Sequence, residues 1–472
     1  MFRDRLTASV PLRTRRDFLT SVGLGLGSVA LMTLQAGPGT AAAVEAPAGP
    51  LSPKPPPFPA RAKRVVHFFL NGGPSHLDTF DPKPALARYA GRPLPTGHLP
   101  TERKTGGAFP SPFQFRHHGQ SGLEISELFP RTAEHADSLA VIRSMRANLP
   151  NHEPSLLLMN CGDSIQSRPS VGSWITYGLG SENQNLPGFV VLCPRGLPVK
   201  EHENWQAGFL PGAYQGTFID SQYTELDRLV ENIRSHHATL AQQQRQLELL
   251  RALNAERAEE RGQDARVEAR IQSFELAYRM QIAAADAFDL GQEPASMRAL
   301  YGNTIHGNQT LMARRLLERG VRYVQLWHGA GQPWDSHAQL EAEHRKLAHE
   351  VDQPIAALLA DLKQRGMFED TLVICGGEFG RTPTTEGSNG RDHNPYGFSV
   401  WLSGGGVRGG MSYGATDEFG FQAVDRPVHV HDLHATLLHL LGFDHEKFVY
   451  RYAGRDFRLT DVHGRVVREL LA

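Results

Sequence analysis

The sequence predicts an α/β fold with a mostly parallel sheet and an inserted pair of helices. In the second half of the chain, short apolar segments alternate with segments of helical spacing, which is typical of parallel strands joined by crossover helices. Residues 223–290 differ, because a long run rich in Ala, Glu, Gln, Arg and Leu keeps helical spacing throughout. We expect this run to form an antiparallel helical pair. Sustained heptads are absent, which argues against a coiled coil.

Short β-branched and aromatic segments mark the predicted strands. Each is bounded by glycine or polar residues, as expected of a strand that is buried on both faces. The predicted strands are residues 64–70, 139–143, 189–193, 321–329, 371–377 and 398–403. The predicted helices are residues 125–138, 155–162, 311–320, 337–365 and 432–442, the last with Asp432 as N-cap and Gly442 after its C-terminal end.

The N-terminal residues have the order of a secretory signal. A basic region carries the pair Arg15–Arg16, an apolar run follows from Val22 to Leu34, and small residues near Ala41–Ala43 offer a cleavage site. The twin arginine is typical of the twin-arginine (Tat) route. We therefore assign residues 1–46 to a Tat signal peptide, so that the Tat translocase is a partner during export and the mature protein is periplasmic or extracytoplasmic. An uncleaved membrane anchor is the alternative.

The rest of the chain divides into a linker and one large domain. Residues 47–62 are rich in proline and are expected to form a stiff, extended linker. Residues 63–472 form the predicted domain, which includes the helical pair. The formal net charge of −1, from 49 basic and 50 acidic residues, gives no support for nucleic-acid binding. The three cysteines lie among apolar or small residues and are expected to be buried thiols.

Polar side chains gather where the predicted strands end. In open α/β sheets ligands bind beyond the C-terminal ends of the strands. Imidazole, carboxylate and amide groups together suit a divalent metal such as zinc, manganese or calcium, whose identity the residues leave open. The candidate metal ligands are Asn71, Asp78, Asp335, His337, Glu378 and His393. Asp78 in an Asx-turn or cap, and Asp335 as the N-cap of the following helix, are the structural alternatives.

Several of these motifs resemble those of a known family. The strings NGGPSHLDTFDPKP, WDSH, GEFGRTP, GRDHNP and WLSGGGVRGG are similar to those of a large uncharacterised family of exported bacterial proteins, domain of unknown function 1501. That family resembles the sulfatases and, more widely, the alkaline phosphatase superfamily. The resemblance covers nearly all of the mature chain. It implies a mixed, mainly parallel sheet between helical layers, with one or two metals at the strand ends.

The same resemblance assigns roles to residues of this chain. Asn71 stands where the superfamily has an aspartate after the first strand, with Asp78 a few residues later. Asp335 and His337 match an aspartate and histidine of a later loop, and His393 matches a further histidine. Glu378 stands in a motif that has lost a histidine, which leaves a single metal, or none, as alternatives.

The nucleophile and the anion-binding residue are the remaining assignments. No cysteine lies in the C-x-P-x-R motif of sulfatases. The segment 155–162 resembles the helix after the sulfatase nucleophile, so His152 is a candidate as ligand or nucleophile, beside Ser75 and Ser155. Arg381 is a candidate for holding an anionic ester oxygen, and a salt bridge to Glu378 is its structural alternative.

The resemblance and the residues together predict an exported, metal-dependent hydrolase of phosphate or sulfate esters. Its partner would be a small-molecule or glycan ester. A non-catalytic relative that binds an anionic glycan is one alternative, and an exported scaffold that uses the helical pair as a partner surface is another.

The export prediction can be tested with lysine substitutions. Changing Arg15 and Arg16 to lysine should leave the protein in the cytoplasm, because the Tat route requires the arginine pair. Cell fractionation followed by immunoblotting measures the outcome. Changing Arg3 and Arg5 to lysine is the matched control, since it leaves the pair intact. Export of the Arg15/Arg16 variant at the normal level would refute the assignment.

Overall fold

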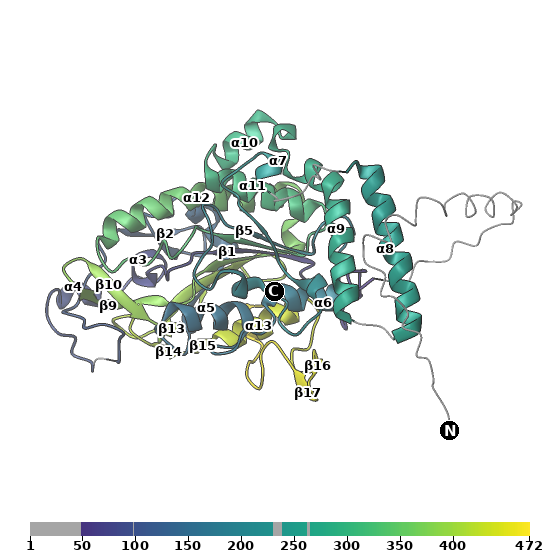
Figure 1. Ribbon diagram of the computed structural model, residues 1–472. Helices are drawn as coiled ribbons and strands as arrows, with labels where there is room; N and C mark the ends of the chain where they lie inside the picture. The colour runs from purple at the N-terminus through teal and green to yellow at the C-terminus, as the bar shows by residue number, and fades with distance from the viewer. Residues whose placement is uncertain (1–48, 98, 230–237, 262–264) are drawn as a thin grey trace, which may run out of the picture. The chain divides into compact units, whose positions relative to one another are not determined.

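The computed structural model describes residues 49–472, except residues 98, 230–237 and 262–264 (Figure 1). The predicted signal peptide, residues 1–46, lies outside the described residues. Within the described part of the chain, no helix combines the length and the apolar character that crossing a membrane requires.

A central sheet carries the fold (Figure 1). Its strand order is β12-β4-β11-β8-β1-β7-β5-β6, and β15 also pairs with β4. Five neighbouring strands run parallel, whereas β11 is antiparallel to both β8 and β4. This arrangement confirms the predicted mixed, mainly parallel sheet. The strands are β1 (Arg64–Phe69), β4 (Leu139–Arg146), β5 (Phe189–Leu192), β6 (Thr217–Ile219), β7 (Tyr323–Trp327), β8 (Thr371–Gly376), β11 (Phe398–Ser403), β12 (Met411–Tyr413) and β15 (Val428–His429).

Helices cover both faces of the sheet (Figure 1). Val66 and Phe68 of β1 pack into a core with helices α10, α11 and α12, whereas Val65 and Phe69 pack into a second core with helices α5, α6 and α13. This division follows from the alternation of side chains along a strand. The helices are α5 (His152–Cys161), α6 (Val171–Leu179), α10 (Ala295–Tyr301), α11 (Ile305–Glu318), α12 (Leu340–Gln364) and α13 (Val430–Leu440).

The run at residues 223–290 contains two long helices, α8 (Leu240–Arg261) and α9 (Ala265–Phe288), which lie side by side (Figure 1). Gln281 donates a hydrogen bond to Gln243 at 2.7 Å, and Arg251 pairs with Glu275. Residues later in α9 thus contact residues earlier in α8, so the pair is antiparallel as predicted. The predicted break between the helices falls at residues 262–264, outside the described residues.

Two predicted helix boundaries and one predicted helix were wrong. Residues 125–138 form the end of strand β3 (Leu123–Ser126) and the 3-10 helix η2 (Thr132–Ser138), because Pro130 interrupts the run. The N-cap of α13 is His429; Asp432 lies in the first turn and accepts a hydrogen bond from the His429 amide at 2.9 Å, which forms a capping box. Helix α12 begins at Leu340, so Asp335 is not its N-cap.

The segments predicted as polar loops after β8 form a two-stranded antiparallel arm. Its strands are β9 (Gly380–Glu386) and β10 (Gly390–Asn394), and His393 lies opposite Arg381 in the register. Period-2 alternation of apolar and polar residues is the usual strand signal, and these polar segments lack it. The arm places His393 and Arg381 beside the C-terminal ends of the central strands.

The proline-rich residues and the three cysteines can also be compared with their predictions. The proline-rich residues 49–62 lie along its surface, where Leu51 is buried and the Lys54 ammonium donates a hydrogen bond to the Tyr177 carbonyl at 2.8 Å. The three cysteines, Cys161, Cys193 and Cys375, are free and buried, as predicted.

Buried ion pairs join α11 to α12 and give a test of fold stability. Arg314 is 1% exposed, and its Nε lies 3.1 Å from Oδ2 of the fully buried Asp361, which also accepts a hydrogen bond from the Tyr301 hydroxyl at 2.9 Å. Asp361→Ala should lower the free energy of unfolding by about 3 kcal/mol, because it leaves a buried guanidinium short of a partner. Chemical denaturation measures this change. Asp456→Ala, which breaks an exposed pair with Arg451, is the control and should change stability by less than about 0.5 kcal/mol. Equal effects of the two variants would contradict the assignment.

Candidate metal centre

Loops from separate strands approach one another closely at the C-terminal edge of the sheet. Gly72, in the loop after β1, has a φ of +109°, and a Cβ on it would lie 2.6 Å from the Asp335 amide nitrogen. A Cβ on Gly390, at the start of β10, would lie 1.8 Å from the His337 carbonyl oxygen. Both positions therefore require glycine, and both hold the loop after β7 against its neighbours.

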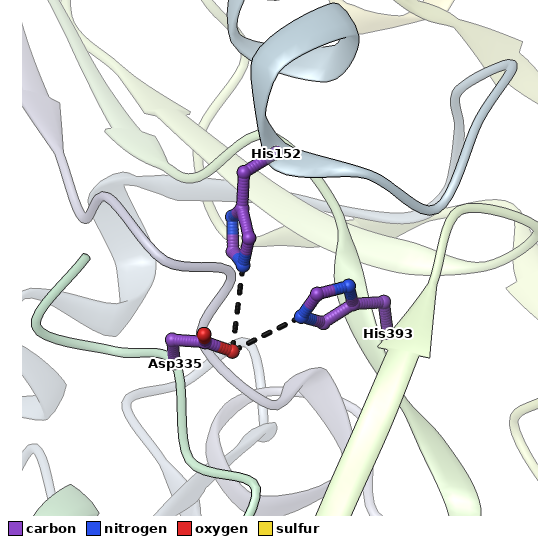
Figure 2. A group of neighbouring side chains, drawn as sticks. All are labelled: His152, Asp335 and His393. Carbon is purple, nitrogen blue, oxygen red and sulfur yellow. Dashed lines mark hydrogen bonds and ion pairs between the residues drawn. The ribbon is translucent and has the colours of Figure 1, made fainter. Parts of the chain in front are cut away.

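Three imidazole rings converge on one carboxylate oxygen at this edge. The Nε2 atoms of His337 and His393 each lie 3.0 Å from Oδ1 of Asp335, and Nε2 of His152 lies 3.4 Å from the same oxygen. Figure 2 shows His152, at the start of α5, and His393, on β10, pointing toward Asp335. We call these four residues the three-histidine centre.

A carboxylate faces the other ring nitrogen of each histidine. Nδ1 of His152 lies 2.7 Å from Oε1 of Glu378, Nδ1 of His337 pairs with Glu386, and Nδ1 of His393 lies 2.6 Å from Oε2 of Glu102. A carboxylate accepts hydrogen bonds, so each Nδ1 carries a proton. In the neutral ring Nε2 then carries a lone pair, which is the arrangement of histidine ligands in metal sites.

The donor set fits a divalent metal ion. The Nε2 atoms of His152 and His337 are buried and have no hydrogen-bond partner, although Asp335 lies close to both. Ligand atoms of His152, Asp335 and His393 all lie within 4.8 Å of one another. Imidazole nitrogens with one carboxylate oxygen are a common zinc ligand set. The residues of the three-histidine centre therefore fit zinc or a similar borderline cation.

Protons and a metal ion compete for these nitrogen atoms. Burial alone would raise the pKa of Asp335, but the three adjacent imidazoles and the Arg381 guanidinium hold that pKa far below its usual value. Burial would lower the pKa of His152, but its bonds to Asp335 and Glu378 raise the pKa to about 9. For His393 burial dominates and lowers the pKa to about 3. Without a metal, the centre thus holds an ionised Asp335 beside a protonated His152.

Arg381 has a different position from the one predicted for an anion-binding residue. Its side chain is fully buried, and it donates to the carbonyl oxygens of Gly73 at 2.8 Å, Trp334 at 3.2 Å and Arg391 at 3.2 Å, and also to that of Gly72. It also donates to Oδ1 of Asp335 at 2.7 Å, so the predicted salt bridge to Glu378 is replaced by one to Asp335. Arg381 therefore joins several loops, and because its side chain is fully buried it is not accessible to a substrate anion.

Glu378 and His152 lie against each other at this edge of the sheet. Glu378 accepts a hydrogen bond from the Gly72 amide at 3.0 Å and lies against Nδ1 of His152, so it orients a ligand atom rather than supplying one. His152, predicted as ligand or nucleophile, supplies the converging Nε2. Asp335, His337 and His393 lie together, with Nε2 of both histidines 3.0 Å from the Asp335 carboxylate.

Three other predicted residues are not brought to the three-histidine centre. Asn71 donates to the carbonyl oxygens of Gly329 at 2.9 Å and Gly331 at 2.7 Å, and thereby fixes the loop after β7. Asp78 pairs with Arg391 at 2.8 Å and accepts a hydrogen bond from the Ser75 hydroxyl at 2.5 Å. Asn71 and Asp78 thus hold the surrounding loops. The Ser75 side chain is fully buried outside the three-histidine centre.

Sequence reasoning missed the residues around the centre. Glu102 and Glu386 orient two of the histidines, and Arg103 lies beside them, with its amide 2.6 Å from Asp392 and its guanidinium 3.0 Å from Glu386. Glu102 and Arg103 belong to an irregular segment, residues 99–107, in which no strand-end pattern marks either residue. Glu386 ends a strand, β9, that was itself predicted as a loop.

The chain belongs to the family described as Protein of unknown function (DUF1501), which matches residues 62–471. A comparison with curated proteins by sequence finds no match.

Solved structures with a similar fold include a sulfatase, a hydrolase and a synthase. The PsFucS1 sulfatase from Pseudoalteromonas sp. is 13% identical, with a TM-score of 0.34, over 82% of this chain and 69% of that chain. The phosphonate monoester hydrolase SpPMH from Silicibacter pomeroyi is 12% identical, with a TM-score of 0.34, over 73% and 71%. The lipoteichoic acid synthase LtaP from Listeria monocytogenes is 10% identical, with a TM-score of 0.36, over 87% and 78%.

The close approach at Gly390 can be tested by adding one carbon atom. Gly390→Ala should destabilise the protein by about 2 kcal/mol, because the new Cβ overlaps the backbone of His337 and forces it to move. Thermal unfolding measures the loss. Gly212→Ala is the matched control, since no atom lies within 4 Å of the added Cβ. If both variants unfold at the wild-type temperature, the close contact between Gly390 and the His337 backbone is refuted.

Proposed function

We propose that the protein is a metal-dependent hydrolase of phosphate or sulfate esters that acts outside the cytoplasm. The observation that carries this proposal is the three-histidine centre, in which each Nδ1 faces a carboxylate and each Nε2 faces Asp335. Export follows from the twin-arginine signal. The ester class follows from the sequence resemblance to sulfatases and alkaline phosphatases.

His152, His337 and His393 would hold the metal through Nε2, with Asp335 as a fourth ligand or as a partner of a bound water molecule. A divalent metal in such a site polarises an ester oxygen and lowers the pKa of water. The glutamates behind the rings keep Nδ1 protonated and make Nε2 a better donor. Arg381 holds Asp335 in place from the other side.

Arg103 is the residue that we propose for binding the anionic ester. Arg381 cannot serve, because its side chain is fully buried. The Arg103 side chain is 52% exposed, and its amide and guanidinium are held beside the centre by Asp392 and Glu386. A guanidinium can donate two parallel hydrogen bonds to phosphate or sulfate oxygens.

Water is the nucleophile that the arrangement favours. The Ser75 hydroxyl donates a hydrogen bond to Asp78. The two ring nitrogen atoms of His152 face Glu378 and Asp335, so neither side chain is free to act as a nucleophile. A water molecule activated beside the three histidines would attack the phosphorus or sulfur atom directly. No covalent enzyme intermediate is then expected.

Metal content and hydrolysis test this proposal together. Protein purified without chelators should contain at least one equivalent of a divalent metal, and removal of that metal should abolish turnover of aryl phosphates or aryl sulfates. His393→Ala should lower kcat/KM by at least about 100-fold, because it removes a ligand. Glu102→Gln should lower metal affinity by about tenfold, since the amide is a weaker acceptor for Nδ1–H. Glu418→Gln, on an exposed pair with Arg88, is the matched control and should leave both properties unchanged.

The outcomes also separate the alternatives. Metal well below one equivalent in active protein would refute the proposed centre. Stoichiometric metal without turnover, together with metal-dependent binding of a sulfated or phosphorylated glycan, would favour a non-catalytic binding protein.

A further inference from the structure

A second group of ligand-type side chains lies outside the three-histidine centre. Ligand atoms of His306, His328 and Glu350 all lie within 4.8 Å of one another. His306 is in the first turn of α11, His328 follows β7, and Glu350 is in the middle of α12. His306 and Glu350 also line a cavity of about 450 Å³.

The protonation of His306 is fixed by its neighbour Gln309. The Gln309 amide nitrogen donates to the carbonyl oxygens of Leu192 and Trp327, at 2.9 and 3.0 Å. Its oxygen therefore faces Nδ1 of His306, 3.1 Å away, and accepts a hydrogen bond from the Nδ1–H group. In the neutral ring, Nε2 of His306 then carries a lone pair. That nitrogen is buried, has no hydrogen-bond partner, and lies 3.6 Å from Oε2 of Glu350.

The protonation of His328 is fixed in the opposite sense. The indole N–H of Trp334 donates to Nδ1 of His328 at 3.1 Å, so the proton of the neutral ring is on Nε2. That N–H donates to Oε2 of Glu350 at 2.9 Å. His328 therefore orients the carboxylate and does not offer a lone pair to a metal.

A nitrogen lone pair and a carboxylate oxygen only 3.6 Å apart repel each other unless a metal cation or a proton lies between them. We propose that His306 and Glu350 bind a divalent metal cation, separate from the three-histidine centre, with His328 as the positioning residue for Glu350. The two side chains provide one imidazole nitrogen and one carboxylate, which suit zinc or manganese.

The cavity leaves room for the remaining ligands. Glu350 has 26% of its side chain exposed, whereas His306 is 4% exposed, so the cation would sit between the protein interior and the cavity. Water molecules or an anionic ligand would complete its coordination from the cavity. Basic and acidic side chains both line this cavity, namely Arg131, Arg195, Arg345, Glu127 and Asp352.

Metal binding by His306 and Glu350 is independent of hydrolysis at the three-histidine centre. The two groups are linked through the chain, since Trp334 holds His328 and precedes Asp335. Their metal ligands are nevertheless different residues, so variants can remove either site alone.

Metal stoichiometry tests the second site directly. Metal-free full-length protein is dialysed to equilibrium against Zn²⁺ at neutral pH, and bound zinc is measured by mass spectrometry. Wild-type protein should bind two equivalents, and both Glu350→Gln and His306→Ala should bind one. His349→Ala, on an exposed histidine that lines the same cavity, is the matched control and should bind two. His393→Ala should also bind one equivalent, which the further change Glu350→Gln should remove.

Each other result has a defined meaning. One equivalent in wild-type protein that Glu350→Gln leaves unchanged would overturn the second site, and a buried imidazolium–glutamate pair would then explain the contact. One equivalent that Glu350→Gln removes but His393→Ala does not would support the second site and refute the three-histidine centre. Because Glu350→Gln keeps the shape of the side chain, far-ultraviolet circular dichroism should show the wild-type fold.

Discussion

The buried ion pair between Arg381 and Asp335 is the interaction on which the candidate centre depends. Asp335 lies in a loop without regular structure, and three histidines from other elements face one of its oxygens. Arg381 fixes that oxygen and at the same time binds carbonyl groups of the loops after β1 and β7. A charged group buried in this way is stable only when its donors are all used, which explains why backbone carbonyls surround the guanidinium. The guanidinium therefore defines where the histidines can meet.

The sheet explains why such distant residues meet at all. Strands β1, β7 and β8 are parallel neighbours, so their C-terminal ends lie at one edge and deliver Asn71, Asp335 and Glu378 there. The β9–β10 arm and the start of α5 then add His393 and His152 from outside the sheet. Glycines at positions 72 and 390 permit the contact distances. The parallel core supplies the location, and the added segments supply most of the nitrogen donors.

The strands and part of the centre could be predicted from the sequence. The other elements could not, for physical reasons that differ from one element to the next. Buried apolar runs identify β1, β5, β7, β8 and β11, because burial on both faces leaves a clear pattern. The polar arm β9–β10 has no such pattern. Asp335, His337 and His393 were expected together, whereas the contact between Glu378 and Nδ1 of His152 was not. Position along the chain places a residue near an edge of the sheet but does not decide which way its side chain turns. Glu102 was missed because a surface segment supplies it.

The three cysteines bear on how the fold responds to oxidants. Cys161, Cys193 and Cys375 are buried, and burial raises the pKa of each thiol well above its usual value. Oxidation and disulfide exchange proceed through the exposed thiolate, which these sites do not provide. No covalent cross-link contributes to the described fold, and no reactive sulfur is offered at its surface. The described fold therefore contains no disulfide whose reduction would destabilise it.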